Sequence, residues 1–356
     1  MKYLKNISFL ALSSILLLVT ACQQTKHEQI IQQQLFTFGT LVDISIISDN
    51  RKQAEETIQL ISRKFETLHK QWHPWLDGDL GRANKAFIKP QFFSTSKAII
   101  QLIKDSQQLS IQSNGLFNPA IGQLIKLWQF DKIEDEHYQF TLPSAEKIKQ
   151  ILKQNPTMSD IIVQQSQIKS NNSAVALDFG AYAKGVAIDN MIEILRQHHI
   201  NNALINAGGD IKVLGSKNGQ PWRIGIKNPT YKQDPQAKNI IAAIELKDNE
   251  SLFTSGNYER FFEFQGKHYH HIIDPRTGYP AIGTQSLTVL TNNAALADVA
   301  STALFIAGPK LWPTIAKQMG ITYVMLIADN GQIYLSSAMA QRITLLGNQK
   351  PIIIHL

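Results

Sequence analysis

The first part of the chain contains two hydrophobic patterns in succession, one with the period of a strand and one with the period of a helix. Within residues 35–48, apolar Val42, Ile44 and Ile46 alternate with polar neighbours, which predicts a half-buried strand. Within residues 54–70, the apolar residues recur at helical spacing, which predicts an amphipathic helix. The chain is therefore expected to open with a strand followed by a helix.

Three further patterns complete the first half. Residues 73–84, "HPWLDGDLGRAN", are rich in Pro and Gly and are expected to form a loop, and "SNGLFNPAIG" (113–122) is expected to form a turn. Helical periodicity predicts a helix over 96–109 and another that starts at Pro143 and Ser144.

The second half is richer in strands. The segment "AVALDFG" predicts a strand ending at Asp178, followed by a helix from about Gly180 to His198. A helix is expected over 294–306, and a hairpin is expected around Asn330 and Gly331. The remaining predicted strands lie within 202–215, 222–229, 240–248, 251–256 and 286–293. Helices and strands mix without strict alternation, which predicts an α+β fold with mixed or antiparallel sheets in one domain over 35–356.

Composition fits a globular protein. The 356 residues are 44% hydrophobic and 18% charged. The formal net charge is +7, but the lysines are scattered among acids and are not interleaved with aromatic residues. The charge therefore predicts no nucleic-acid partner.

The first residues indicate export and a lipid anchor. Residues 1–21 combine a short basic start with an apolar run that is too short to span a membrane, which is typical of a signal peptide. Small residues precede Cys22 as in a bacterial lipobox, so Cys22 is the expected lipidation site; an ordinary signal peptide with a chance cysteine is the alternative. Residues 22–34 are expected to form a flexible tether. Cys22 is the only cysteine, which leaves no internal disulfide and no catalytic thiol.

The segment "DFGAYAKGVAID" (178–189) has the composition of a phosphate site. It lacks the Walker and dinucleotide-binding patterns, yet it places small residues at a predicted helix start, where free N–H groups favour anions. Lys184 would add a positive charge, and Asp178 would accept hydrogen bonds from a ligand. The alternative is a capping Asp beside a solvated Lys.

Two glycine-containing stretches allow two interpretations each. Gly208 and Gly209 permit close approach of a ligand, or simply a bulge or tight hairpin. Ser255 and Gly256 in "FTSGNYERFF" offer donors to a ligand, or form an ordinary turn.

Polar residues near the C-terminal half suggest a base and a metal site. His270 and His271 are adjacent on a predicted strand, so their side chains point to opposite faces and at most one serves a site. Asp298 and Thr302 lie four residues apart on one face of a predicted helix. The many alanines of this helix let another group approach it closely. The oxygens of Asp298 and Thr302 suit Mg²⁺, although a Thr that bonds back into its own helix is the alternative.

Seven motifs together resemble the ApbE family of FAD:protein FMN transferases. They occur in the family's order and span most of the chain beyond residue 37. They are "FGT" (38–40), "GLFNP" (115–119), "DFGAYAKGVAID" (178–189), "NAGGDI" (206–211), "TSGNYER" (254–260), "HIIDPRTGYP" (271–280) and "ADVAST" (297–302).

The resemblance implies a Mg²⁺-dependent transfer of FMN from FAD to a Thr or Ser of a partner protein, with release of AMP. By motif position, Mg²⁺ would be held by Asp298, Thr302 and the carbonyl of Ala181, and His271 is the candidate base. The implied FAD contacts are Phe38, Trp75, Leu116, Phe117, Asn118, Asp178, Lys184, Ser255, Gly256 and Ile272.

Some positions depart from the family pattern. The family often has Met at the position of Phe38 and Asp at that of Asn118, which predicts adjusted FAD contacts. Residues 73–84 replace a Tyr and a D-S-x-L run, and Trp75 is the candidate substitute aromatic. This segment is expected to influence whether FAD is transferred or hydrolysed.

The implied acceptors are subunits of membrane electron-transport complexes, such as a sodium-pumping NADH:quinone reductase. The chain is expected on the periplasmic side of a Gram-negative membrane, and Gln23 after the cysteine favours the outer one. Two rival functions are a Mg²⁺-dependent FAD pyrophosphatase and a non-catalytic FAD-binding lipoprotein.

Overall fold

A computed structural model describes residues 28–133, 135, 137–230 and 238–356. The predicted leader 1–21 and the predicted lipidation site Cys22 lie outside the described residues.

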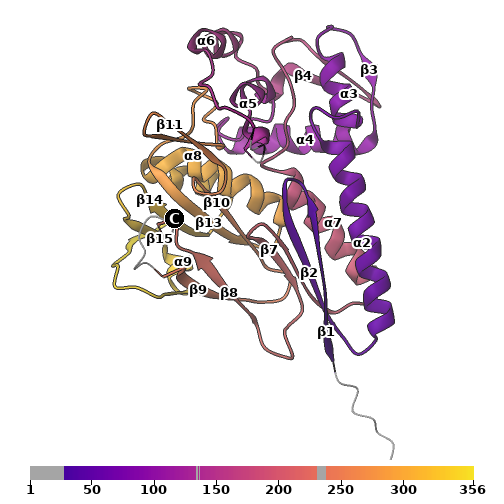
Figure 1. The fold of residues 1–356 in the computed structure, drawn as a ribbon, viewed down its shortest axis with the longest axis vertical. Helices are drawn as coiled ribbons and strands as arrows, with labels where there is room; N and C mark the ends of the chain where they lie inside the picture. Colours follow the sequence, from indigo (N-terminus) through magenta and orange to yellow (C-terminus); the bar gives the residue numbers. More distant parts are fainter. Residues whose placement is uncertain (1–27, 134, 136, 231–237) are drawn as a thin grey trace, which may run out of the picture.

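A nine-stranded sheet forms the centre of the fold (Figure 1). Neighbouring strands are antiparallel except for the last pair, β15 and β17. In spatial order the strands are β1 (Gln29–Thr37), β2 (Thr40–Ser48), β6 (Asn202–Ala207), β7 (Asp210–Leu214), β10 (Ser251–Gly256), β13 (Thr284–Thr291), β14 (Tyr323–Ala328), β15 (Ile333–Ser336) and β17 (Ile352–Ile354).

Different layers cover the two faces of this sheet. Helices α2 (Arg51–Trp72), α7 (Ala183–Gln197) and α8 (Ala294–Gln318) bury their apolar residues in one cluster with the sheet. The opposite face packs against a small sheet of β8 (Trp222–Lys227), β9 (Ile240–Leu246) and β16 (Ile343–Leu345), beside the short helix α9 (Ser337–Ala340). Mixed and antiparallel sheets with packed helices confirm the predicted α+β class.

The remaining elements lie at the upper end of the molecule in Figure 1. A third apolar cluster joins α5 (Gly122–Trp128), the 3₁₀ turn η1 (Phe130–Lys132), α6 (Ala145–Gln154), and the hairpin of β11 (Phe261–Phe264) and β12 (Lys267–His270). Beside it lie α3 (Asp79–Ala86), α4 (Lys97–Gln112), the 3₁₀ turn η2 (Met158–Asp160), and a sheet of β3 (Phe93–Ser94), β5 (Gln167–Ser170) and β4 (Ile161–Gln164).

The N-terminal strand prediction was only partly right. Val42, Ile44 and Ile46 are fully buried, as the alternation predicts. However, the segment 35–48 is not one strand, because a two-residue turn at Phe38 and Gly39 divides it into β1 and β2. β1 begins at Gln29, so the predicted tether of 22–34 is wrong over 29–34. β2 is also covered on both faces, since Ile47 belongs to the second apolar cluster.

Two other element predictions were wrong. The predicted loop 73–84 includes most of helix α3. The predicted strand before Asp178 is an extended segment that has one isolated bridge, between Ala176 and Ile121. Asn84 fixes this segment by exchanging hydrogen bonds with the backbone N–H and C=O of Leu177, at 2.7 and 2.9 Å.

Helices α7 and α8 cross at very short range. A Cβ atom on Gly185 would lie 2.3 Å from the carbonyl oxygen of Ala294, so only glycine fits there. Helix α8 runs past the predicted end at 306 and bends at Gly308, where φ is 68°. Among the described residues, α8 is long and apolar enough to cross a membrane by length and composition, but it is mostly buried inside the protein.

An ion pair fixes this crossing. The Asp189 carboxylate of α7 accepts hydrogen bonds from the N–H groups of Ala294 and Ala295, at 3.3 and 3.0 Å, and so supplements the N-cap that Asn293 provides for α8. The same carboxylate lies 2.9 Å from the buried Lys212 ammonium of β7. One acid thus ties two helices to the central sheet.

We expect Asp189→Ala to lower the free energy of unfolding by about 3 kcal/mol, because it leaves two N–H groups of α8 without their acceptor and leaves Lys212 buried without its carboxylate partner. Urea denaturation of both proteins measures the difference. Glu55→Ala, which breaks the exposed pair with Arg51, is the control and should change the free energy of unfolding by less than about 0.5 kcal/mol. Equal effects of the two substitutions would contradict the role given to Asp189.

Candidate active site

The candidate site begins at the turn that leads into α7. The carboxylate of Asp178 accepts a hydrogen bond from the N–H of Gly180 at 2.8 Å. Helix α7 starts at Ala183, three residues later than predicted, so Ala181 lies in the turn and not in the helix. Burial raises the pKa of Asp178, although the Gly180 N–H and the positive charge of Arg260 oppose the shift. The Asp178 carboxylate therefore stabilises the turn, and the positive charge of Arg260 acts on it.

Lys184 connects this turn to two acids from distant parts of the chain. Its ammonium lies 3.2 Å from an Asp298 oxygen of α8 and 3.4 Å from an Asp210 oxygen of β7. It also donates to the carbonyl of Gly180 at 3.3 Å. Burial disfavours the charged form, but the two carboxylates outweigh burial and raise the pKa of Lys184. Lys184 is a charged, half-buried group, not a solvated one.

Asp210 was not among the predicted site residues. It follows the double glycine of the β6–β7 hairpin, and its carboxylate accepts a hydrogen bond from the N–H of Thr254 at 3.1 Å. Burial raises the pKa of Asp210 to about 7, and the nearby Asp298 acts in the same direction, while Lys184 opposes the shift. The sequence signal was the acid after two glycines, which by itself fits an ordinary hairpin.

Oxygen groups surround Asp298 on α8. Its second carboxylate oxygen accepts a hydrogen bond from the N–H of Gly185 at 3.0 Å. One turn further along, the Thr302 hydroxyl lies 3.2 Å from that of Ser255 at the end of β10. Ser255 also donates to Ser301 at 3.0 Å. The predicted pair Asp298 and Thr302 thus lies beside the hydroxyls of Ser255 and Ser301.

The two adjacent histidines have different environments. His270 is buried, with one ring nitrogen 2.8 Å from the carbonyl of Ala281 and the other accepting from the N–H of Ile272 at 3.3 Å. The Nδ1 atom of His271 lies 3.2 Å from the carbonyl of Arg260. Because a carbonyl only accepts, Nδ1 of His271 carries the proton and Nε2 keeps a free lone pair.

Burial lowers the pKa of His271 to about 3, and the positive charge of Arg260 acts in the same direction. Lys184 has a smaller effect of the same sign, which places His271 within the electric field of the Lys184 cluster. His271 is therefore neutral at physiological pH.

The turn between β1 and β2 brings Phe38 to this region. Phe38 and Gly39 both have positive φ, 51° and 68°, a conformation that a bulky residue rarely adopts. The Phe38 ring lies against residues of α2, with its centroid 5.5 Å from that of His69. The guanidinium of Arg260 donates to the carbonyl of Gly39 at 3.3 Å.

Arg260 is a second residue that sequence reasoning missed. It lies within a predicted motif, yet its importance depends on a tertiary arrangement. The same residue binds Gly39 through its side chain and His271 through its carbonyl, and its charge acts on Asp178 and Lys184. It therefore links the Phe38 turn to the candidate base.

The remaining predicted FAD contacts are mostly packed residues. Leu116, Phe117 and Ile272 are at most 5% exposed and belong to the main core. The Phe117 ring contacts that of Tyr182, and the Phe117 N–H donates to the Ser113 hydroxyl at 3.1 Å. The Asn118 side chain holds the carbonyl of Pro156 at 2.9 Å.

Gly256 and Trp75 have local partners. A Cβ atom on Gly256 would lie 2.6 Å from the Tyr258 ring, so close packing explains this glycine. The Trp75 ring lies under the ammonium of Lys126, which is 4.8 Å from the ring centroid. Among the described residues, Trp75 contacts His73 and Lys126 and not the Lys184 cluster, so its FAD role stays a prediction.

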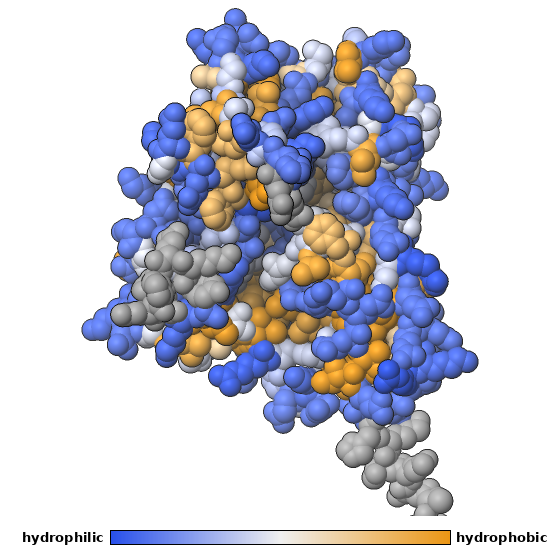
Figure 2. Space-filling model, in the orientation of Figure 1, coloured by the Kyte–Doolittle hydropathy of each residue, from blue (hydrophilic) through white to orange (hydrophobic). Residues whose placement is uncertain are grey.

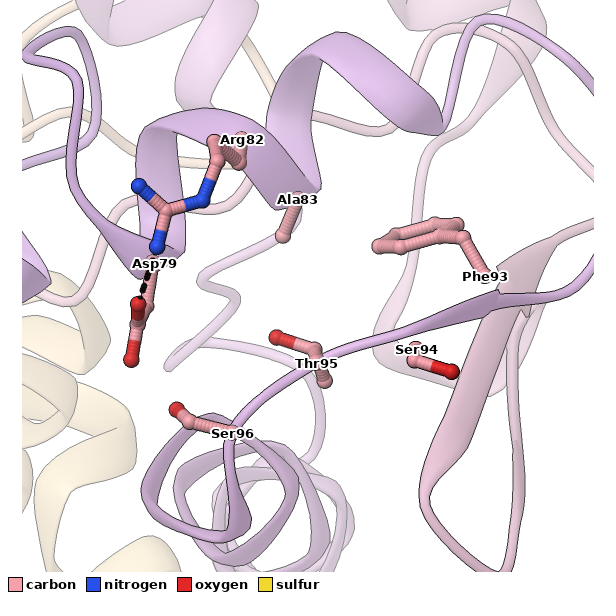
Figure 3. Close-up of a pocket in the computed structure, with 7 residues that line it drawn as sticks. All are labelled: Asp79, Arg82, Ala83, Phe93, Ser94, Thr95 and Ser96. Carbon is pink, nitrogen blue, oxygen red and sulfur yellow. Dashed lines mark hydrogen bonds and ion pairs between the residues drawn. The ribbon is translucent and has the colours of Figure 1, made fainter.

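A pocket near residues 73–84 is separate from this cluster. It lies between α3, β3 and the start of α4, and none of the predicted site residues lines it (Figure 3). Its lining residues are Asp79, Arg82, Ala83, Phe93, Ser94, Thr95 and Ser96. Arg82 and Asp79 pair with each other and so neutralise the charge on this wall.

The surface around the Phe38 turn is partly apolar. Figure 2 shows a largely hydrophilic face on which apolar residues gather around a hollow near its middle. Phe36 and Leu41, a cross-strand pair beside the turn, are 59% and 50% exposed.

The donor set fits a cation that prefers oxygen. Within the described ranges, no group of three or more His, Cys, Asp or Glu side chains is arranged to hold a metal. A cation here would depend on Asp298 together with hydroxyl and carbonyl oxygens, which are the ligands that Mg²⁺ accepts. Lys184 joins the turn of Ala181 to Asp298, whereas the Ala181 carbonyl as a ligand stays a prediction.

Comparisons with known proteins identify a family for this chain. Residues 38–325 match the ApbE family. A FAD:protein FMN transferase of Rhodobacter capsulatus is 36% identical over 88% of this chain, which spans only 58% of that longer relative. One from Klebsiella pneumoniae is 33% identical, covering 68% of this chain and 73% of the relative.

A solved structure shares the fold. The ApbE protein of Thermotoga maritima superposes with a TM-score of 0.79 at 28% identity, over 88% of this chain and 99% of that one. Since the family match also covers most of the chain, the protein belongs to the ApbE family.

Proposed function

We infer that this chain is a FAD:protein FMN transferase, the activity that the names of its Rhodobacter and Klebsiella relatives state. The observation that carries the proposal is the convergence of Lys184, Asp210 and Asp298, from three separate elements, beside the hydroxyls of Ser255 and Thr302. A site of this kind presents carboxylate and hydroxyl oxygens to a cation, and the cation would neutralise a diphosphate.

The proposed reaction exchanges the phosphoanhydride bond of FAD for a phosphoester bond to the acceptor. The oxygen of an acceptor Thr or Ser forms a bond to the phosphorus on the riboflavin side of FAD. The bond from that phosphorus to the bridging oxygen breaks, and AMP leaves with the electron pair. The acceptor proton would pass to Nε2 of His271, the ring nitrogen that is left unprotonated when Nδ1–H donates to the Arg260 carbonyl.

The other residues bind and orient. Lys184 and Arg260 would place two positive charges near the diphosphate, and the carboxylates of Asp298 and Asp210 keep Lys184 charged. Asp298, Thr302 and the carbonyl of Ala181 would hold Mg²⁺. When bound, Mg²⁺ would neutralise negative charge on the diphosphate oxygens.

Location and acceptor are part of the proposal. The predicted leader and Cys22 support a lipid-anchored protein on the periplasmic side of a membrane. Subunits of membrane electron-transport complexes, such as a sodium-pumping NADH:quinone reductase, are the proposed acceptors.

The test is incubation of the full chain with FAD, Mg²⁺ and purified subunits of such a quinone reductase, followed by mass spectrometry of the subunits. We expect one subunit to gain the mass of FMN and an equal amount of AMP to appear. Free FMN and AMP with unlabelled subunits would favour the pyrophosphatase instead. Unchanged FAD would contradict any catalytic role.

A further inference from the structure

Three hydroxyl groups form a chain beside Asp298. The Thr302 hydroxyl lies 3.2 Å from that of Ser255, and the Ser255 hydroxyl donates to that of Ser301 at 3.0 Å. The Ser301 hydroxyl in turn donates to the main-chain carbonyl of Asp298 at 3.0 Å. The chain therefore begins at one candidate metal ligand and ends on the backbone of the other.

The end of the chain fixes the direction of every proton in it. A carbonyl oxygen only accepts, so Ser301 donates its single hydroxyl proton to the main-chain carbonyl of Asp298. Ser255 donates its own hydroxyl proton to the Ser301 oxygen. At the contact between Ser255 and Thr302, only Thr302 still has a proton to donate, and Ser255 is the acceptor.

This direction determines what Thr302 offers to a ligand. A hydroxyl that binds a cation must present a lone pair, and the proton of Thr302 is held toward β10 by Ser255. A helical Thr otherwise tends to donate to the carbonyl four residues earlier, which here belongs to Asp298. Ser301 already donates to that carbonyl, and Ser255 supplies a competing acceptor.

We propose that Ser255 and Ser301 are positioning residues that hold the Thr302 hydroxyl with its lone pairs free for a divalent cation. The inference rests on the proposed function, because it assigns Thr302 to the cation site. It also changes the role of Ser255, from a predicted FAD contact to a group that acts through Thr302.

The role of Ser301 makes the proposal testable, since its hydroxyl contacts Ser255 and Asp298 and acts on Thr302 only through Ser255. Without Ser301, the Ser255 hydroxyl loses its acceptor and can turn its proton toward Thr302, which occupies a lone pair that the cation needs. A purely structural Ser301 would affect unfolding but not cation binding.

The experiment measures Mn²⁺ binding to the full chain by electron paramagnetic resonance, with Mn²⁺ as the probe for a Mg²⁺ site. We expect Ser255→Ala and Ser301→Ala each to raise the Kd roughly 10- to 100-fold, the range for groups that orient a metal ligand. Ser255→Thr keeps the hydroxyl and should restore binding to within about 3-fold of the unsubstituted protein, since one retained hydroxyl preserves the chain of donors.

A hydroxyl pair on the opposite face of β10 provides the control. Thr288 lies 2.9 Å from Thr254, hydroxyl to hydroxyl, and takes no part in the chain. Thr288→Val should leave the Kd for Mn²⁺ unchanged, and thermal unfolding of each variant verifies that it is folded.

Folded Ser301→Ala protein that binds Mn²⁺ as tightly as the unsubstituted chain would overturn the inference. So would an unsubstituted chain that transfers FMN but binds no Mn²⁺. Failure of the proposed function looks different: the unsubstituted chain would bind Mn²⁺ with the expected order of variants, yet no acceptor would gain FMN.

Discussion

Replacing Asp298 with asparagine is expected to lower the rate of FMN transfer by roughly 10³-fold or more. Asn keeps the shape of the side chain and can still accept from the N–H of Gly185, but it removes the negative charge that faces Lys184. A cation that depends on this carboxylate contributes several kcal/mol to the transition state, and each ~1.4 kcal/mol is a factor of ten in rate. Labelled acceptor formed per minute at saturating FAD measures the effect.

The loss should come from the site and not from unfolding. Lys184 keeps its second partner, Asp210, so the ammonium does not become an isolated buried charge in the variant. Asp43→Asn is the matched control, because its carboxylate also accepts side-chain hydrogen bonds, from Gln34 and Asn206, but lies outside the cluster. Transfer by Asp298→Asn at the rate of the Asp43 variant would remove Asp298 from the proposed mechanism.

Local patterns predicted the layers of the fold well. The alternation in 40–48 and the helical spacing in 54–70 reflect burial against one core, and that burial is present in β2 and α2. Ser96 and Ser144 cap α4 and α6, close to the predicted starts. These signals are local because capping and periodicity depend on neighbours in the chain.

The errors arose where tertiary contacts replace local ones. Residues 175–178 form no regular strand, because the Asn84 side chain satisfies the backbone of Leu177 and the backbone of 119–122 bonds to Ala176 and Asp178. Asp210 and Arg260 were missed for a related reason. Each is unremarkable in its own segment, and only the folded chain brings Asp210 to Lys184 and Arg260 to His271.

The second large effect is expected for His271. His271→Ala should lower the rate of transfer by about 10²- to 10⁴-fold, the usual contribution of a general base. The Nδ1–H of His271 is held by the Arg260 carbonyl, so Nε2 is the atom available for the acceptor proton. The binding of FAD should change little, since the cationic groups of Lys184 and Arg260 remain. A single-turnover assay separates the two quantities.

The neighbouring histidine is the natural comparison. Burial lowers the pKa of His270 to about 4, well below its ordinary 6.5, so His270 favours folding at neutral pH and this contribution is lost as the pH falls from about 6.5 to about 4. His270→Ala should therefore lower stability at pH 7 and flatten this acid dependence, whereas the folded fraction of the variant should still transfer FMN. His271→Ala should do the reverse, with a large loss of turnover and a small loss of stability. Because β12 ends at His270, His271 lies just beyond the strand on which both histidines were predicted. If the folded His270 variant loses turnover as severely as the His271 variant, the assignment of the base to His271 is wrong.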